Sequence, residues 1–321
     1  MRPFSLARPR SLAEALELLP GATAIAGGTD LLGLMKAGVV GPVRIVDLTG
    51  LEGLEGWSRA RGDGLRIGAL TKLADLESSA ELRRLLPIVP ASLADAATPQ
   101  LRAMGTVGGN LLQRNRCWYF RDEAFTCWLK GGTTCFAREG EHQLHAVVGA
   151  AECIAVTPGD LAPALIACDA TVELRSPDEA RELTLAELFT VPHGARRHEH
   201  ALRPDEVITA VRVPETALGR AGAFRKQMDR KAWSFALVSV AATARLKAGR
   251  VRDARIVLGG VAPIPWRATA AEALLEGQPL DEATCARAAA EALAGAEPLP
   301  QNAYKVPLAI EAVRRTLLDL A

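Results

Sequence analysis

Four cysteines in the middle of the sequence form the clearest group of possible metal ligands. They are separated by nine, seven and seventeen residues and contain no C-x-x-C pair: Cys117, Cys127, Cys135 and Cys153. A structural zinc site usually takes its cysteines in close pairs, so the wide spacing fits the cage of an iron–sulfur cluster somewhat better. Spacing alone leaves two other interpretations open, a zinc site that uses His142 or His145 and simple buried thiols. Cys168 and Cys285 are expected to be core thiols.

Two glycine pairs are candidates for binding a phosphate-bearing cofactor. Residues 26–30 read AGGTD, and residues 106–110 read TVGGN. Paired glycines let backbone N–H groups approach an anion at the start of a helix, but ordinary tight turns use the same residues. In the tight-turn interpretation Asp30 caps its own helix, which would turn its carboxylate toward that helix. Two such loops on either side of one αβ unit favour an extended ligand such as a dinucleotide.

Other residues near these motifs have two possible roles each. Lys226 lies among charged neighbours, which is typical of a surface strand, but its cation could instead face a flavin or phosphates. The aromatic residues 118–120 directly follow Cys117 and could shield a cluster from water or simply fill a core.

Strands and helices must position these residues, and the pattern predicts them in alternation over the first half. Strands are predicted at 22–26, 44–47 and 65–70, and a helix follows the first glycine pair from Leu31. Residues 114–152 follow neither a helical nor a strand period, so they indicate an insertion. A strand is predicted next at 153–156, then a helix capped by Asp160 that runs to Ala167.

The last third of the chain predicts a separate small domain. Residues 214–220 are a plausible linker, and strands are predicted at 223–228, 234–246 and 254–261, the last two joined by a turn at Gly249 and Arg250. Helices are predicted at 268–275, 281–293 and 307–321. We therefore expect one domain over residues 1–215, with the insertion at about 114–153, and a sheet-and-helix domain over 216–321.

Composition excludes several classes of protein. The chain has 321 residues, of which 49% are hydrophobic and 23% charged, as in ordinary globular proteins. A net charge of +1 provides no broad attraction for nucleic acid, and no apolar run is long enough for a membrane span. The first residues lack the apolar core of a signal peptide, so a cytoplasmic location is expected, with co-export to the periplasm on a signal-bearing partner as the alternative.

Five ordered motifs resemble the FAD-binding medium subunit of the molybdenum hydroxylases, the family of xanthine dehydrogenases and aldehyde oxidoreductases. The motifs are AIAGGTDLL (24–32), QLRAMGTVGGNLLQ (100–113), TPGDLAPAL (157–165), LRPDEVI (202–208) and FALVSV (235–240) with LGGV (258–261). Within the family, the chain is most similar to the subgroup that carries a cysteine-rich insertion after the second glycine loop, as the FAD subunit of the periplasmic aldehyde oxidoreductase does.

The resemblance implies a fold and a set of cofactor contacts. The fold is α+β: a two-part FAD-binding domain of the vanillyl-alcohol oxidase type, then a small C-terminal antiparallel sheet with helices. The implied FAD contacts are Ile25, Ala26, Gly27, Gly28, Thr29, Asp30, Leu31, Thr106, Gly109, Asn110, Asp160 and Lys226. The implied ligands of a [4Fe–4S] cluster are Cys117, Cys127, Cys135 and Cys153. No catalytic residue is expected, because the substrate chemistry of this family lies in another subunit.

The resemblance also implies partners and a role. A molybdopterin-binding large subunit would oxidise an aldehyde or a purine-like heterocycle, and a small subunit with two [2Fe–2S] clusters would relay electrons to the FAD of this chain. The assembly would be a heterotrimer or a dimer of heterotrimers. The alternatives are a zinc-stabilised, non-catalytic binding module and a flavin oxidoreductase that works without a molybdenum partner.

Overall fold

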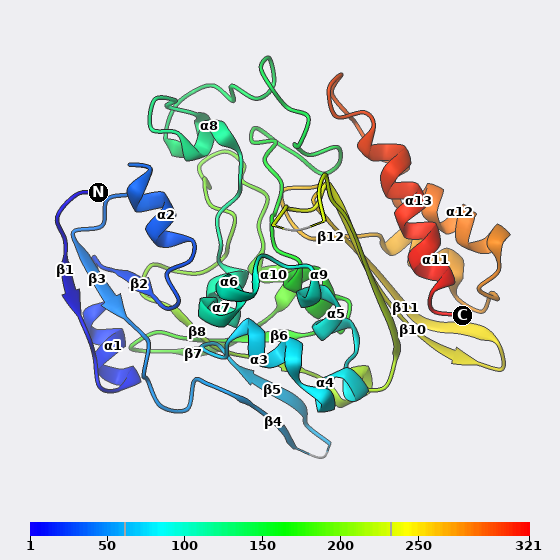
Figure 1. The fold of residues 1–321 in the computed structure, drawn as a ribbon, viewed down its shortest axis with the longest axis horizontal. Helices are drawn as coiled ribbons and strands as arrows, with labels where there is room; N and C mark the ends of the chain where they lie inside the picture. The colour runs from blue at the N-terminus through cyan, green and yellow to red at the C-terminus, as the bar shows by residue number, and fades with distance from the viewer. Residues whose placement is uncertain (61, 232) are drawn as a thin grey trace.

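The computed structural model describes residues 1–60, 62–231 and 233–321, and within them the fold is α+β, as predicted (Figure 1). Three sheets of three, five and four strands each have helices packed on them. In these ranges, every helix is too short or too polar to cross a bilayer.

A small parallel sheet begins the chain and carries the first glycine loop. Its strands run in the order β1 (Ser5–Ala7), β3 (Arg44–Asp47) and β2 (Thr23–Ile25), and α1 (Leu12–Leu18) and α2 (Leu31–Lys36) connect them. Buried side chains of α1, including Ala15 and Leu16, form a core cluster with Val46 and Leu48. This packing places the loop between β2 and α2 at the carboxyl end of the sheet, because Ile25 pairs with Asp47, the last residue of β3.

The second part is an antiparallel sheet covered by short helices. Its order is β4 (Trp57–Ala60), β5 (Gly64–Gly68), β8 (Val207–Val213), β6 (Thr171–Arg175) and β7 (Ala180–Thr184). The helices of this part are α3 (Leu73–Ser78), α4 (Ala80–Leu85), α5 (Ile88–Ala94), α6 (Pro99–Met104), α7 (Val107–Leu111), α9 (Leu161–Ile166) and α10 (Leu185–Leu188). Apolar residues of β5, β6 and β8 and of all these helices except α6 share one core cluster, which holds α7 and α9 in place.

The insertion contains little regular structure, as predicted. It has only α8 (Trp118–Arg121) and the 3-10 turn Trp128–Lys130, and it lies at the top of Figure 1 between α2 and the last helix of the chain. The strand predicted at 153–156 is wrong. Backbone groups here bond to two different segments, with Ile154 accepting from Ala146 and Thr157 donating to Ala262, so no ladder forms.

The C-terminal part is an antiparallel sheet with three helices on one face. The sheet order is β12 (Trp266–Arg267), β11 (Arg250–Gly259), β10 (Val238–Lys247) and β9 (Ala221–Gln227), and the helices are α11 (Thr269–Leu275), α12 (Glu282–Ala292) and α13 (Lys305–Leu318). The β10–β11 turn lies one residue earlier than predicted, because Ala248 and Gly249 are the residues that adopt positive φ. Strand β9 also contacts α5, which joins this part to the preceding domain.

Candidate functional site: two glycine loops and a cysteine-lined cavity

The first glycine loop passes so close to a neighbouring backbone that only glycine fits. A Cβ on Gly27 would lie 2.0 Å from the carbonyl oxygen of Met104, at the end of α6. Gly28 has a φ of +70°, a conformation that other residues rarely adopt. The glycine pair therefore brings the loop against the residues that lead into the second loop.

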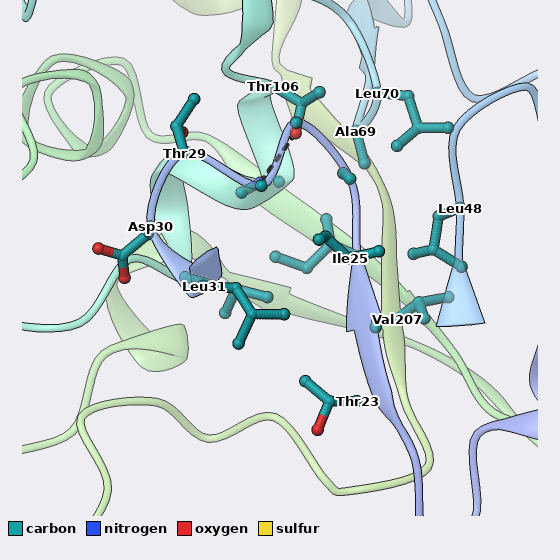
Figure 2. A pocket seen from close by; sticks show the side chains of 18 of the residues that line it. Thr23, Ile25, Thr29, Asp30, Leu31, Leu48, Ala69, Leu70, Thr106 and Val207 are labelled. Atoms are coloured by element: carbon teal, nitrogen blue, oxygen red, sulfur yellow. Dashed lines mark hydrogen bonds between the residues drawn. The ribbon is translucent and has the colours of Figure 1, made fainter. Parts of the chain in front are cut away.

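The second glycine pair lies within a one-turn helix. Thr106 caps α7, and its Oγ1 accepts a hydrogen bond of 3.2 Å from the Gly109 backbone (Figure 2). A Cβ on Gly108 would lie 3.2 Å from the Cβ of Ala69, so this glycine allows α7 to pack closely on the segment after β5. Thr106 and Gly109 are thereby held at the wall of a cavity.

A cavity of about 430 Å³ lies between the two loops (Figure 2). The predicted cofactor residues on its wall are Ile25, Ala26, Gly27, Gly28, Thr29, Asp30, Leu31, Thr106 and Gly109. Residues outside the twelve expected cofactor contacts complete the wall, among them Leu48, Leu70 and Val207. Ordinary apolar residues of this kind give no local signal, and only the packing of the two sheets brings them to the cavity.

The expectation that Asp30 caps its own helix is wrong. Its side chain makes no capping bond; one oxygen accepts from the Arg114 backbone N–H at 2.9 Å, and the other pairs with Arg116 and with Arg121, the latter at 2.8 Å. In Figure 2 the carboxylate points outward from the loop, away from Ile25 and Leu48. Burial by itself would raise the pKa of Asp30, but the two guanidinium groups outweigh it and the pKa is lowered. The first glycine loop is thus tied by charge to the insertion.

A second, smaller cavity of about 100 Å³ continues from the first and shares Thr29, Asp30 and Gly109 with it. It adds the three remaining predicted cofactor residues, Asn110, Asp160 and Lys226. The structure therefore places all twelve around two adjoining cavities.

Lys226 and Asp160 form a buried ion pair across the domain junction. Lys226 Nζ lies 2.8 Å from Asp160 Oδ2 and also donates to the Asp95 carbonyl oxygen, and only 2% of the Lys226 side chain is exposed. Lys226 is therefore no surface lysine. Asp160 does not cap α9 with its side chain, contrary to expectation, because its carboxylate is turned to Lys226. Burial raises the pKa of Asp160, and the Lys226 charge opposes that shift.

Two buried oxygens at the smaller cavity lack a partner among the described residues. Asp160 Oδ1 and Asn110 Oδ1 are both inaccessible and accept no hydrogen bond there. Leaving a buried acceptor unsatisfied costs about 1–3 kcal/mol. These two acceptors thus fit a polar ligand that carries N–H or O–H groups.

The four clustered cysteines line one small cavity. The aromatic side chains of Tyr119 and Phe120 lie at the same cavity. Burial raises the pKa of the Cys117 thiol to about 11, and the pKa of Cys153 is also raised by burial. A core cluster that includes Phe120, Trp128 and Leu34 encloses Cys127 and Cys153. The fold thus gathers all four thiols at one cavity, with Cys127 and Cys153 buried and Cys117 and Cys135 half-buried.

The described residues contain no group arranged to hold a single metal ion. Nowhere in the described ranges do three or more His, Cys, Asp or Glu side chains come within ligating range of one metal ion. In this structure the four thiols therefore do not form a ready-made zinc site.

The two histidines of the insertion have different surroundings. Both ring nitrogens of His142 bond to backbone groups. Nδ1 lies near the carbonyl oxygens of Ala137 and Gly140, and Nε2 accepts from Gln301 N at 3.1 Å. His145 instead places Nε2 3.2 Å from Cys117 Sγ. Burial next to the Lys305 charge lowers the pKa of His145 to about 4.

Arg197, which sequence reasoning did not single out, holds the turn between two of the cysteines. Its guanidinium donates to the carbonyl oxygens of Trp128 (2.7 Å) and Gly132 (2.8 Å) and stacks over the Trp128 ring. No local pattern could have indicated this contact, because Arg197 belongs to a polar loop far along the chain. Cys168 and Cys285, in contrast, are buried core thiols as predicted.

Comparison with known protein families gives two matches that together cover nearly the whole chain. The FAD binding domain in molybdopterin dehydrogenase matches residues 2–216. The CO dehydrogenase flavoprotein C-terminal domain matches residues 223–320.

Individual relatives agree with these matches. The aldehyde oxidoreductase FAD-binding subunit PaoB of Escherichia coli is 40% identical across 100% of this chain and 98% of its own length. The carbon monoxide dehydrogenase medium chain of Afipia carboxidovorans is 30% identical across 89% of this chain and 84% of its own length. Among solved structures, a carbon monoxide dehydrogenase from Hydrogenophaga pseudoflava superposes with a TM-score of 0.78 at 27% identity, covering 98% of this chain and 96% of that one.

Proposed function

Because this chain belongs to the family of FAD-binding subunits of the molybdopterin-dependent dehydrogenases, we propose that the two adjoining cavities hold one FAD molecule. The observation that carries this proposal is the convergence of both glycine loops on one cavity that continues to Asp160 and Lys226. An elongated cofactor with a phosphate-bearing middle fits such a pair of cavities.

Each part of the cofactor is assigned to a part of the site. The backbone of residues 25–31 binds the pyrophosphate, since Gly27 and Gly28 allow close approach to that loop. Thr106, Gly109 and Asn110 lie along the isoalloxazine and ribityl side. Asp160 and Lys226 contact the cofactor beyond these three residues. There the unsatisfied oxygens of Asp160 and Asn110 offer acceptors for N–H or O–H groups of the cofactor.

The insertion binds a [4Fe–4S] cluster through Cys117, Cys127, Cys135 and Cys153. Support comes from the single cavity that all four line, and from the lack of a group spaced for one ion in the described ranges. The aromatic wall of that cavity would keep water from the cluster. A zinc site is the weaker interpretation, because both ring nitrogens of the candidate ligand His142 bond to backbone groups.

The chain acts as the electron-transfer subunit of a molybdenum-dependent oxidoreductase of the aldehyde or xanthine type. Its partners are a molybdopterin-binding large subunit and a small subunit with two [2Fe–2S] clusters, in a heterotrimer or a dimer of heterotrimers. When bound, FAD supplies the redox chemistry: it takes electrons from the partner subunits and passes them to an acceptor. The FAD-binding domain extends to about residue 215, and the remainder forms the small C-terminal domain.

The test is cofactor analysis of the complex, purified without oxygen after co-expression with the two other subunits. We expect one FAD per chain and about four irons with matching sulfide beyond those of the small subunit. Cys127→Ser and Cys135→Ser should lose these irons, whereas Cys285→Ala, which removes a thiol in the core of the C-terminal domain, should keep them.

Two results would overturn parts of this proposal. Zinc in place of the additional iron, or anaerobic material with FAD but without that iron, would refute the cluster. A chain that carries FAD and never co-purifies with partner subunits would instead be a flavin oxidoreductase that works alone.

A further inference from the structure

We propose that His145 donates a hydrogen bond from Nε2 to the sulfur of Cys117 and thereby raises the reduction potential of the [4Fe–4S] cluster. This inference rests on the cluster assigned to the insertion above. It makes His145 a positioning and tuning residue rather than a fifth ligand.

The geometry places one ring nitrogen directly at one sulfur. His145 Nε2 lies 3.2 Å from Cys117 Sγ, and both residues line the cavity of the four cysteines. Cys117 and His145 also line a larger cavity of about 450 Å³, so they form part of the wall between it and the cysteine cavity. Of the four proposed ligands, Cys117 is thus the one beside this larger cavity.

Groups from the C-terminal domain hold the backbone of His145 in place. The carbonyl oxygen of His145 accepts from Lys305 Nζ at 3.0 Å and from Asn302 Nδ2 at 3.3 Å. Lys305 is fully buried and also donates to Leu144 O and Gly260 O. On its other side the ring meets Trp118 edge-on, with centroids 5.3 Å apart. The backbone of His145 is thus fixed by buried hydrogen bonds, and Trp118 packs against its ring.

The direction of the bond follows from the chemistry of the sulfur. A cysteine that binds iron does so as a thiolate, which has no proton to give and can only accept. His145 Nδ1 is buried and has no partner among the described residues, so Nε2 is the nitrogen with an acceptor for the ring proton. An N–H on the sulfur stabilises the added negative charge of the reduced cluster, which moves the potential upward.

The experiment compares three histidine variants of the complete complex. His145→Phe keeps a flat ring against Trp118 but has no donor, and His145→Gln keeps an N–H donor. His198→Phe, at an exposed histidine, is the matched control. The potential is measured by anaerobic titration with dithionite and mediators, with the reduced cluster followed by electron paramagnetic resonance. In this step one electron from dithionite enters the cluster, and no bond forms or breaks.

We expect a lower potential in His145→Phe, a potential near that of the unaltered complex in His145→Gln, and no shift in His198→Phe. An unshifted potential in His145→Phe that still holds its four irons would overturn the inference. A complex that lacks these irons before any substitution would instead refute the cluster itself, so the two failures are distinguishable.

A second measurement covers the case in which His145→Phe loses its cluster. In the unaltered complex with ¹⁵N-labelled histidine, pulsed electron paramagnetic resonance of the reduced cluster should detect one weakly coupled histidine nitrogen. Absence of this coupling, or coupling of the strength expected for direct iron ligation, would contradict the hydrogen bond.

Discussion

Lys226 of β9 and Asp160 at the start of α9 form an ion pair of 2.8 Å in which 2% and 7% of the two side chains are exposed. The pair joins the C-terminal sheet to the first domain at the smaller cavity. Its burial makes each partner dependent on the other, because a lone buried charge is costly.

Lys226→Met should therefore destabilise the protein strongly. It leaves the Asp160 carboxylate buried without its cation, which typically costs about 3–5 kcal/mol. The neighbouring residue supplies the control: Arg225 pairs with the half-exposed Asp319, so Arg225→Met should cost about 1 kcal/mol or less. Urea denaturation of both variants measures the difference. If the two variants lose the same free energy of unfolding, the buried Lys226–Asp160 pair is no more important for stability than the more exposed Arg225–Asp319 pair.

Gly27→Ala should abolish FAD binding. The added methyl group would lie 2.0 Å from Met104 O, so the loop must move away from the residues that lead to Thr106. Gly33→Ala in α2 is the control, because its added methyl meets nothing within 4 Å and alanine favours a helix by about 1 kcal/mol. Flavin absorbance per mole of purified protein measures the outcome. Full flavin in Gly27→Ala would refute the assignment of this loop to the cofactor.

Asp30→Asn should loosen the contact between the first glycine loop and the insertion. Removing the carboxylate leaves Arg116 and Arg121 without a counter-charge, and we expect a loss of about 2 kcal/mol. Limited proteolysis should then cut the insertion near Arg121 faster. Asp63→Asn removes a more exposed partner of Arg212. It should change neither the stability nor the rate of cleavage appreciably. If cleavage rates stay equal, Asp30 does not secure the insertion.

Glu206 should make stability depend on pH below about 4.5. Burial by itself would raise the pKa of this carboxylate, but its bonds from Arg181 at 2.6 and 2.8 Å and from Arg203 at 2.8 Å outweigh burial and lower the pKa to about 2. The unfolded chain has an ordinary glutamate pKa of about 4.3, so the unfolded state binds the proton first as pH falls. The unaltered protein should have a free energy of unfolding about 2 kcal/mol larger than that of Glu206→Gln. This difference should be constant from pH 7 to 5 and shrink toward pH 2.

The check is urea denaturation of both proteins across this range of pH. The control is Glu179→Gln, which removes a half-exposed partner of Arg203. An advantage that grows as the pH falls would contradict the lowered pKa of Glu206.

The family resemblance implied the α+β class. Local sequence patterns predicted the strand–loop–helix unit at the first glycine pair and, in the C-terminal part, three of the four strands and the three helices. These features follow from local patterns: the period of apolar residues, helix-forming composition and glycine at turns. The same locality explains the failures. The strand predicted at 153–156 has a strand-like composition, but its backbone partners at Ala146 and Ala262 belong to separate segments that form no ladder.

Only the tertiary structure decided what the charged and polar side chains near the site do. Asp30 and Asp160 both stand where a residue usually caps a helix, yet each turns to a cation distant in the sequence, Arg121 and Lys226. Likewise, nothing local to His145 indicates that its ring meets Cys117. A side chain binds whichever partner the packed domains bring within reach, and a buried charge favours an opposite charge over the backbone of its own helix. The sequence thus determined which residues could do chemistry, and packing determined which of them meet.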